Sequence, residues 1–188
     1  HNMPAKQRKI AIMGFRSVGK SSVTIQFVEG QFVDSYDPTI ENTFVKSFRY
    51  RGQDYEVRLV DTAGQDEYDI FPGQYSIDTH GYVLVYSITN YKSFEIVQII
   101  YEKLLDHTGK VNVPIALVGN KTDLHMERVV SFEEGKKLAE SWKVPFIEAS
   151  AKESEVSRYY FVYLRVGIIV KGDWQTKFDI FQFCFHVI

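Results

Sequence analysis

Hydrophobic positions along the chain follow two spacings, one typical of strands and the other of helices. Residues 82–86 and 114–118 are almost continuously apolar, as the central strands of a parallel sheet are. Between them, apolar side chains at helical spacing predict a helix over about 94–105. This alternation predicts an α/β fold, with a six-stranded, mostly parallel sheet and helices on both faces. The other predicted strands are 8–13, 44–50, 54–60 and 146–147, and the other predicted helices are 20–29 and 131–142.

Two local signals refine this picture. Residues 44–50 and 54–60 alternate between apolar and polar and are joined at Arg51-Gly52, so they predict a β-hairpin at the antiparallel edge of the sheet. Ser131 and Glu134 have the spacing of a capping box, which predicts that a helix begins there.

The run from Gly14 to Ser21, GFRSVGKS, joins the first predicted strand to the first predicted helix. It matches the pattern G-x-x-x-x-G-K-[ST], in which a curled backbone and a helix N-terminus face a polyphosphate. Lys20 is then placed to reach the β- and γ-phosphates, and the Ser21 hydroxyl to bind Mg²⁺. The alternative is an ordinary glycine-bounded turn with its lysine in solvent. The segments that follow argue against that alternative.

Residues 61–65, DTAGQ, end the second strand of the predicted hairpin. Asp61 is placed to hold Mg²⁺ through water, the Gly64 N–H to meet a γ-phosphate, and Gln65 to orient an attacking water. By itself the segment also fits an Asx-type turn. Thr39, in the loop before the hairpin, offers its hydroxyl to Mg²⁺ and its N–H to the γ-phosphate.

Two later segments predict recognition of a guanine base. Asp123, in the run NKTD at 120–123, is placed to accept hydrogen bonds from guanine N1–H and from the N2 amino group. Adenine lacks this pair of donors and would leave a buried charge unpaired. The stem of Lys121 is expected to lie along the base, and the Ala151 N–H to reach guanine O6, although a lone Ser-Ala-Lys is common. Phe32 either packs against the base edge or belongs to the core.

Composition narrows the class of protein. A chain of 188 residues suggests one domain, and a formal net charge of −2 without a basic stripe argues against nucleic acid as a partner. The single cysteine, Cys184, excludes a disulfide framework or a cysteine-based zinc site and favours a reducing, cytoplasmic setting. The scattered histidines fit surface positions, and no apolar run is long enough to span a membrane. His1 and Asn2, before Met3, are set aside as an appended remnant.

These five segments, over about residues 8–152, resemble the Ras-like small GTPases, and within them the Rheb branch. The telling run is 14–22, because typical Ras proteins have glycine where this chain has Arg16. The resemblance implies a P-loop small GTPase fold and a monomeric switch that binds GTP or GDP with Mg²⁺ and hydrolyses GTP slowly. It also implies two partners: the TOR kinase complex, activated by the GTP form, and a GTPase-activating protein of the tuberin type.

The resemblance assigns roles to particular residues. Gln65, Lys20 and Tyr36 are the expected catalytic residues, and Arg16 either crowds the space that Gln65 needs or points into solvent. The expected metal ligands are Ser21, Thr39 and Asp61. The expected nucleotide contacts are Ser17, Val18, Gly19, Lys20, Ser21, Ser22, Phe32, Val33, Asp34, Tyr36, Pro38, Thr39, Gly64, Asn120, Lys121, Asp123, Leu124, Ser150, Ala151 and Lys152.

The resemblance stops near residue 153. We therefore expect an N-terminal lead (1–7), a GTP-binding domain (8–152) and a divergent segment (153–188). The apolar stretch 159–170 either folds back as the last helix or associates with a surface. A C-a-a-X box needs cysteine fourth from the end and Cys184 is fifth, so we expect no prenylation, although the family associates with endomembranes. A nucleotide-locked interaction protein that cannot cycle remains the alternative function.

Overall fold

The computed structural model describes residues 4–33, 38–50, 52–109 and 113–153. Within them, one sheet has the strand order β2-β3-β1-β4-β5-β6. All neighbouring strands are parallel except β2 and β3, which form the antiparallel hairpin at one edge. The predicted six-stranded, mostly parallel sheet is therefore confirmed. The strands are β1 (Lys6–Gly14), β2 (Glu41–Tyr50), β3 (Gln53–Thr62), β4 (Gly81–Ser87), β5 (Ile115–Asn120) and β6 (Phe146–Glu148).

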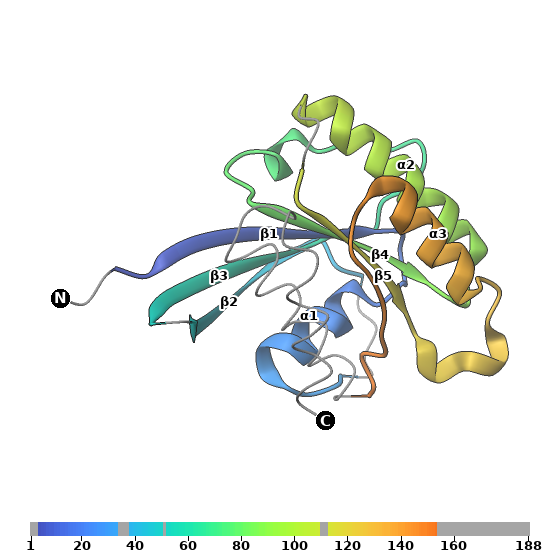
Figure 1. Ribbon diagram of the computed structural model, residues 1–188, viewed down its shortest axis with the longest axis horizontal. Helices are drawn as coiled ribbons and strands as arrows, with labels where there is room; N and C mark the ends of the chain where they lie inside the picture. The colour runs from blue at the N-terminus through green and yellow to red at the C-terminus, as the bar shows by residue number, and fades with distance from the viewer. Residues whose placement is uncertain (1–3, 34–37, 51, 110–112, 154–188) are drawn as a thin grey trace.

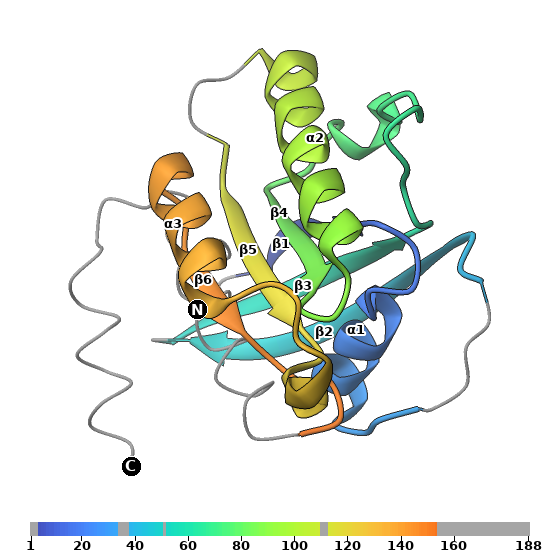
Figure 2. The ribbon, with the colours of Figure 1, turned by 90° about the vertical axis from the view of Figure 1, so that its right-hand side faces the viewer.

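The helices cover both faces of this sheet, as predicted. The α-helices are α1 (Lys20–Glu29), α2 (Tyr91–Thr108) and α3 (Phe132–Trp142), and the 3₁₀ helices are η1 (Gly73–Tyr75) and η2 (Thr122–Glu127). Figures 1 and 2 show α1 on one face and α2 and α3 on the other. Helix α1 contacts β1, β2 and β3, whereas α2 packs on β4 and β1 and α3 on β5 and β6. The two 3₁₀ helices were not predicted.

Three sequence predictions concern parts of the chain outside the described residues. They are the contacts assigned to Asp34 and Tyr36, the helix over 159–170, and Cys184 with its prenylation signal. Among the helices that the structure describes, none combines the length and the apolar character that crossing a membrane requires.

The core includes the whole of β4 and β5, which both have neighbouring strands on either side in the sheet. Every residue of both strands is buried, and their register places Leu84 beside Leu117. Burying one such side chain contributes roughly 1.5–3 kcal/mol. The two apolar runs recognised in the sequence are therefore the strands that anchor the sheet, and their ends fix where loops leave it.

A capping box starts α3, as the sequence predicted. The Ser131 hydroxyl accepts a hydrogen bond from the Glu134 N–H, and a Glu134 carboxylate oxygen accepts one from the Ser131 N–H, at 3.2 and 2.8 Å. Because this cap satisfies free N–H groups of the first turn, it fixes the residue at which the chain leaves the loop after η2.

Stacking between α2 and α3 provides a stability test away from the loops. The rings of Tyr101 and Trp142 lie 3.9 Å apart between centroids and 8° from parallel. We expect Trp142→Leu to lower the free energy of unfolding by about 1–3 kcal/mol, because it removes a stacked pair and part of a packed side chain. Chemical denaturation of the full chain measures this loss. An unchanged midpoint would mean that this contact adds nothing to the packing of the two helices.

Candidate nucleotide-binding site

A cavity of about 700 Å³ opens where β1, β3, β5 and β6 end. This is the edge at which open parallel sheets bind ligands, because the loops after neighbouring strands meet there. Segments far apart in the sequence therefore share one cavity. Its lining residues are Arg16, Ser17, Gly19, Lys20, Ser21, Ser22, Phe32, Val33, Pro38, Thr39, Ala63, Gly64, Asn120, Lys121, Asp123, Leu124, Ala151 and Lys152.

The loop between β1 and α1 forms one end of the cavity. Gly19 has a φ of 92°, and a methyl group there would collide with the side-chain amide of Asn120. Only glycine therefore fits between the loop and β5 at this point. Helix α1 begins at the next residue, so its free N–H groups and positive dipole end lie beside the cavity. This end suits a group of anionic oxygens.

Lys20 is held in place over the loop that carries it. Its Nζ donates to the carbonyl oxygens of Gly14 and Phe15, at 3.0 and 2.9 Å, and the residue is only 6% exposed. Burial lowers the pKa of Lys20 to about 8, and the nearby negative charge of Asp61 opposes this shift. A buried ammonium with an incompletely compensated charge attracts an anionic ligand.

Three oxygen-bearing side chains meet beside Lys20. The Ser21 Oγ donates to the Asp61 Oδ2 at 2.6 Å and lies 2.7 Å from the Thr39 Oγ1. The second oxygen of Asp61 is buried and has no hydrogen-bond partner within the described part of the chain. Burial raises the pKa of Asp61, while the Ser21 hydrogen bond and the Lys20 charge oppose that rise.

These oxygens fit a hard divalent cation. Mg²⁺ is usually held by one or two carboxylates, hydroxyls, waters and ligand phosphates rather than by a cage of acidic side chains. The residues that the structure describes contain no group of three or more His, Cys, Asp or Glu suited to a metal. One carboxylate and two hydroxyls beside a polyphosphate cradle therefore match Mg²⁺ better than a zinc or calcium site.

The segment after β3 closes over the loop from the opposite side. A Cβ at Gly64 would lie 2.6–2.8 Å from backbone and Cβ atoms of Arg16, so the two chains are in direct contact. The Arg16 side chain is exposed, with its guanidinium 5.1 Å from the Phe15 ring centroid. Because Arg16 also lines the cavity, both predicted alternatives, crowding of the site and a side chain in solvent, stay predictions.

Gln65 lies differently from its neighbours in this segment. Its N–H donates to the Gly14 carbonyl at 3.0 Å, and the residue is 8% exposed. The side-chain Oε1 is buried with no hydrogen-bond partner among the described residues, and Gln65 does not line the cavity. The side chain predicted to orient water is therefore packed away from the space in which water would be needed.

The opposite end of the cavity is built by the loops after β5 and β6. The Asn120 side chain donates to the Val18 carbonyl at 2.9 Å and accepts from the Ala151 N–H at 3.3 Å. The Ser150 hydroxyl donates to the Asp123 Oδ1 at 2.7 Å, which leaves the other carboxylate oxygen for a ligand. Asp123 and Ala151 both line one space, the arrangement expected for a base with donors and an acceptor on one edge, and the Ala151 N–H would be shared between this base and Asn120.

Most of the predicted contact residues line the cavity, including Phe32, Val33, Pro38, Leu124 and Lys152. Val18, Ser150 and Asp61 do not; they hold residues that do. Ala63 also lines the cavity and was not predicted. The sequence signal that could have identified Ala63 is its position between two predicted residues, Asp61 and Gly64.

The comparisons with known proteins agree with this site. The family model for the Ras family matches residues 9–168. The chain therefore belongs to the Ras family, and it is a small GTPase with that family's P-loop fold. Over 153 residues, 81% of this chain, it is 73% identical to "GTP-binding protein Rheb homolog" of Drosophila melanogaster, covering 84% of that protein.

Two other relatives also support the resemblance to the Rheb branch, which the sequence predicted. The chain is 69% identical to "GTP-binding protein Rheb" of Homo sapiens over 153 residues, which are 81% of this chain and 83% of that one. It is 59% identical to "GTP-binding protein rhb1" of Schizosaccharomyces pombe over 152 residues, 81% and 82% of the two chains.

The lowered pKa of Lys20 predicts a pH dependence of binding. A polyphosphate stabilises the charged ammonium, so the bound protein keeps a proton that the free protein loses above about pH 8. We expect the affinity for GDP with Mg²⁺ to be constant below that pH and to fall by up to about tenfold per pH unit above it. Titration of a fluorescent GDP at pH 7 and 9 measures this fall.

Lys20→Arg is the matched control, because arginine stays charged over the whole range. Any pH dependence left in this variant belongs to other groups, such as guanine N1–H. Equal slopes in both proteins would mean that Lys20 is charged in the free protein and that its burial does not bear on binding.

Proposed function

We propose that this protein is a guanine-nucleotide switch that binds GTP or GDP with Mg²⁺ and hydrolyses GTP slowly. One observation carries the proposal. A single cavity has a phosphate-binding loop with Lys20 at one end and the Asp123 carboxylate, held by Ser150, at the other. Membership of the Ras family and the printed names of the relatives support the same function.

The phosphates would lie between the loop and the start of α1. The Nζ of Lys20 would exchange its hydrogen bonds to two loop carbonyls for hydrogen bonds to phosphate oxygens. The side chain would need only a small movement for this exchange. Ser21 and Thr39 would hold Mg²⁺ directly, and Asp61 would hold it through water. The second Asp61 oxygen, which is buried and has no hydrogen-bond partner among the described residues, fits this role. Bound there, the cation neutralises charge that develops on the phosphates during hydrolysis.

Thr39 supplies the switch in this proposal. It is the only one of the three predicted metal ligands that belongs to the connection between α1 and β2. Its hydroxyl already lies against Ser21, so a γ-phosphate and Mg²⁺ would fix this connection, and loss of the γ-phosphate would release it. A partner that contacts the connection would then distinguish the two nucleotide states.

The proposed partners follow from the resemblance to Rheb. They are the TOR kinase complex, engaged by the GTP form, and a tuberin-type GTPase-activating protein. The second is physically apt because Gln65 does not line the cavity, so hydrolysis needs groups that a partner supplies. We further propose that the protein acts as a monomer in the cytoplasm.

Asp123→Asn tests the choice of base. We expect the affinity for GDP to fall by about 10–100-fold, because each mismatched polar contact costs roughly 1–3 kcal/mol. Xanthosine diphosphate should gain, since its 2-oxo group accepts from the new amide. Glu127→Gln, an exposed carboxylate on η2 outside the cavity, is the matched control and should change neither affinity. Equal binding of ADP and GDP by the unmodified protein would refute the assignment.

Gln65→Leu tests the origin of slow turnover. We expect single-turnover hydrolysis of GTP without a partner to stay within about twofold of the unmodified rate, because the buried Gln65 side chain does not reach the cavity. Gln74→Leu makes the same change at an exposed residue of η1 and serves as the control. A loss of tenfold or more specific to Gln65 would show that it orients the attacking water.

A further inference from the structure

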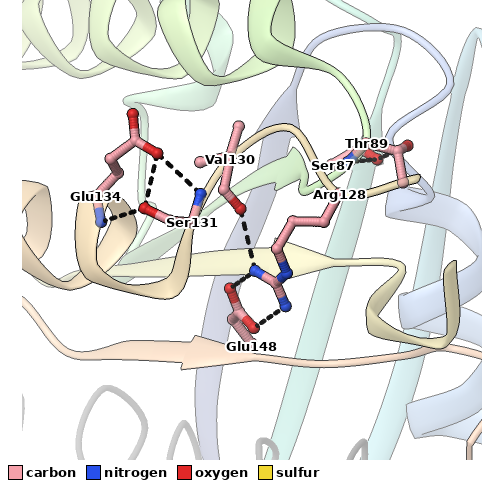
Figure 3. Close-up of polar contacts among 7 residues, drawn as sticks. All are labelled: Ser87, Thr89, Arg128, Val130, Ser131, Glu134 and Glu148. Carbon is pink, nitrogen blue, oxygen red and sulfur yellow. Dashed lines mark hydrogen bonds and ion pairs between the residues drawn. The ribbon is translucent and has the colours of Figure 1, made fainter. Parts of the chain in front are cut away.

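An ion pair behind the cavity joins the two loops that would read the base. The Arg128 Nη1 and Nη2 donate to the two carboxylate oxygens of Glu148 at 2.6 and 2.7 Å (Figure 3). The side chains are 28% and 12% exposed, respectively. Neither residue lines the cavity. Two parallel, charge-assisted hydrogen bonds fix direction as well as distance, which a lysine in place of Arg128 would not do.

The positions of the two partners give the pair its significance. Arg128 directly follows η2, whose first turn carries Asp123, and Glu148 ends β6, two residues before Ser150. On the cavity side, the same two segments are joined by the Ser150–Asp123 hydrogen bond of 2.7 Å. The segments are thus connected at both ends of η2, once beside the ligand and once behind it.

Arg128 is itself anchored to the fold. Its Nη1 also donates to the Val130 carbonyl at 3.0 Å, and the N–H groups of Val129 and Val130 donate to the Ile88 carbonyl just beyond β4, at 2.8 and 3.0 Å. The capping box of α3 begins at the following residue, Ser131 (Figure 3). The backbone that carries Arg128 is therefore followed directly by hydrogen bonds to Ile88 and by the cap of α3.

Such a pair does more for geometry than for stability. Desolvating two charges offsets much of their attraction, so a half-buried ion pair contributes little net free energy of folding. The hydrogen-bonded fork nevertheless permits one relative placement of its two backbones. Reading guanine requires such a placement, because Asp123 and the Ala151 N–H come from different segments and must meet one planar base.

We propose that Arg128 and Glu148 are positioning residues that hold Asp123 and Ala151 in the relative placement needed to read guanine. The pair thereby sets the rate of nucleotide release and the preference for guanine over related bases. This inference rests on the proposed function, since it concerns the same ligand. It assigns a role to two residues outside the cavity, at the end of η2 opposite Asp123.

The test measures release and base preference in the full-length chain. Arg128→Lys keeps the charge but loses the fork, and Glu148→Gln keeps the shape but loses the charge. We expect each to speed release of fluorescent GDP on the order of tenfold. We also expect the affinity ratio of GDP to inosine diphosphate to narrow, because inosine lacks the N2 amino group that a well-placed Asp123 would recognise.

The double variant should release GDP no faster than the more severe single variant, because both changes break one contact. Trp142→Leu is the matched control: it weakens helix packing and should leave release and the GDP:inosine diphosphate ratio unchanged. If the ion-pair variants lose thermal stability but keep the unmodified ratio, the pair is only structural and the inference is wrong. Additive effects of the two changes would also contradict it.

The proposed function fails separately. If the unmodified protein shows no preference for GDP over ADP, the guanine assignment itself is wrong. If it prefers GDP and both ion-pair variants behave like it, the function stands and the positioning role is refuted. Should one variant not fold, the other still decides between these outcomes.

Discussion

The side-chain amide of Asn120 is the contact on which the arrangement of the site depends. It is buried, and it uses its donor for the loop after β1 and its acceptor for the loop after β6, while its own backbone ends β5. Three strand ends are thereby joined by one planar group whose nitrogen and oxygen each make a hydrogen bond. A shorter or charged side chain would leave a buried carbonyl or N–H without a hydrogen bond. The loops at the two ends of the cavity would then no longer be held to one shared side chain.

The buried charges at the phosphate end follow a different logic. Lys20 and Asp61 are both buried. Burial lowers the pKa of Lys20 and raises the pKa of Asp61, so it favours the neutral form of each. Each is only partly compensated by the other, so the free protein carries an electrostatic cost at this end of the cavity. An anionic ligand bound with a cation removes that cost, and therefore adds to the stability of the folded chain as well as occupying the site.

The sequence predicted those parts of the molecule that local pattern determines. Residues 82–86 and 114–118 could be read as central strands because their burial on both faces excludes polar residues. The phosphate loop and NKTD run were recognisable because their chemistry depends on neighbours in the chain. The burial of Gln65 and the pairing of Arg128 with Glu148 depend on tertiary packing, and the latter joins residues 20 positions apart with no shared periodicity. The short η1 and η2 were missed because one or two 3₁₀ turns leave no repeating apolar stripe.

Two glycines give the family's sequence signature a meaning separate from catalysis. At Gly19 a methyl group would occupy the space of the Asn120 amide, and at Gly64 it would overlap the backbone of Arg16. Neither glycine contributes a side chain, and the volume that a side chain would need there is already filled by another segment. These two glycines of the signature are therefore required by steric exclusion, because no side chain fits at either position. A chain that keeps these glycines preserves the distances between the segments even where the surrounding side chains change.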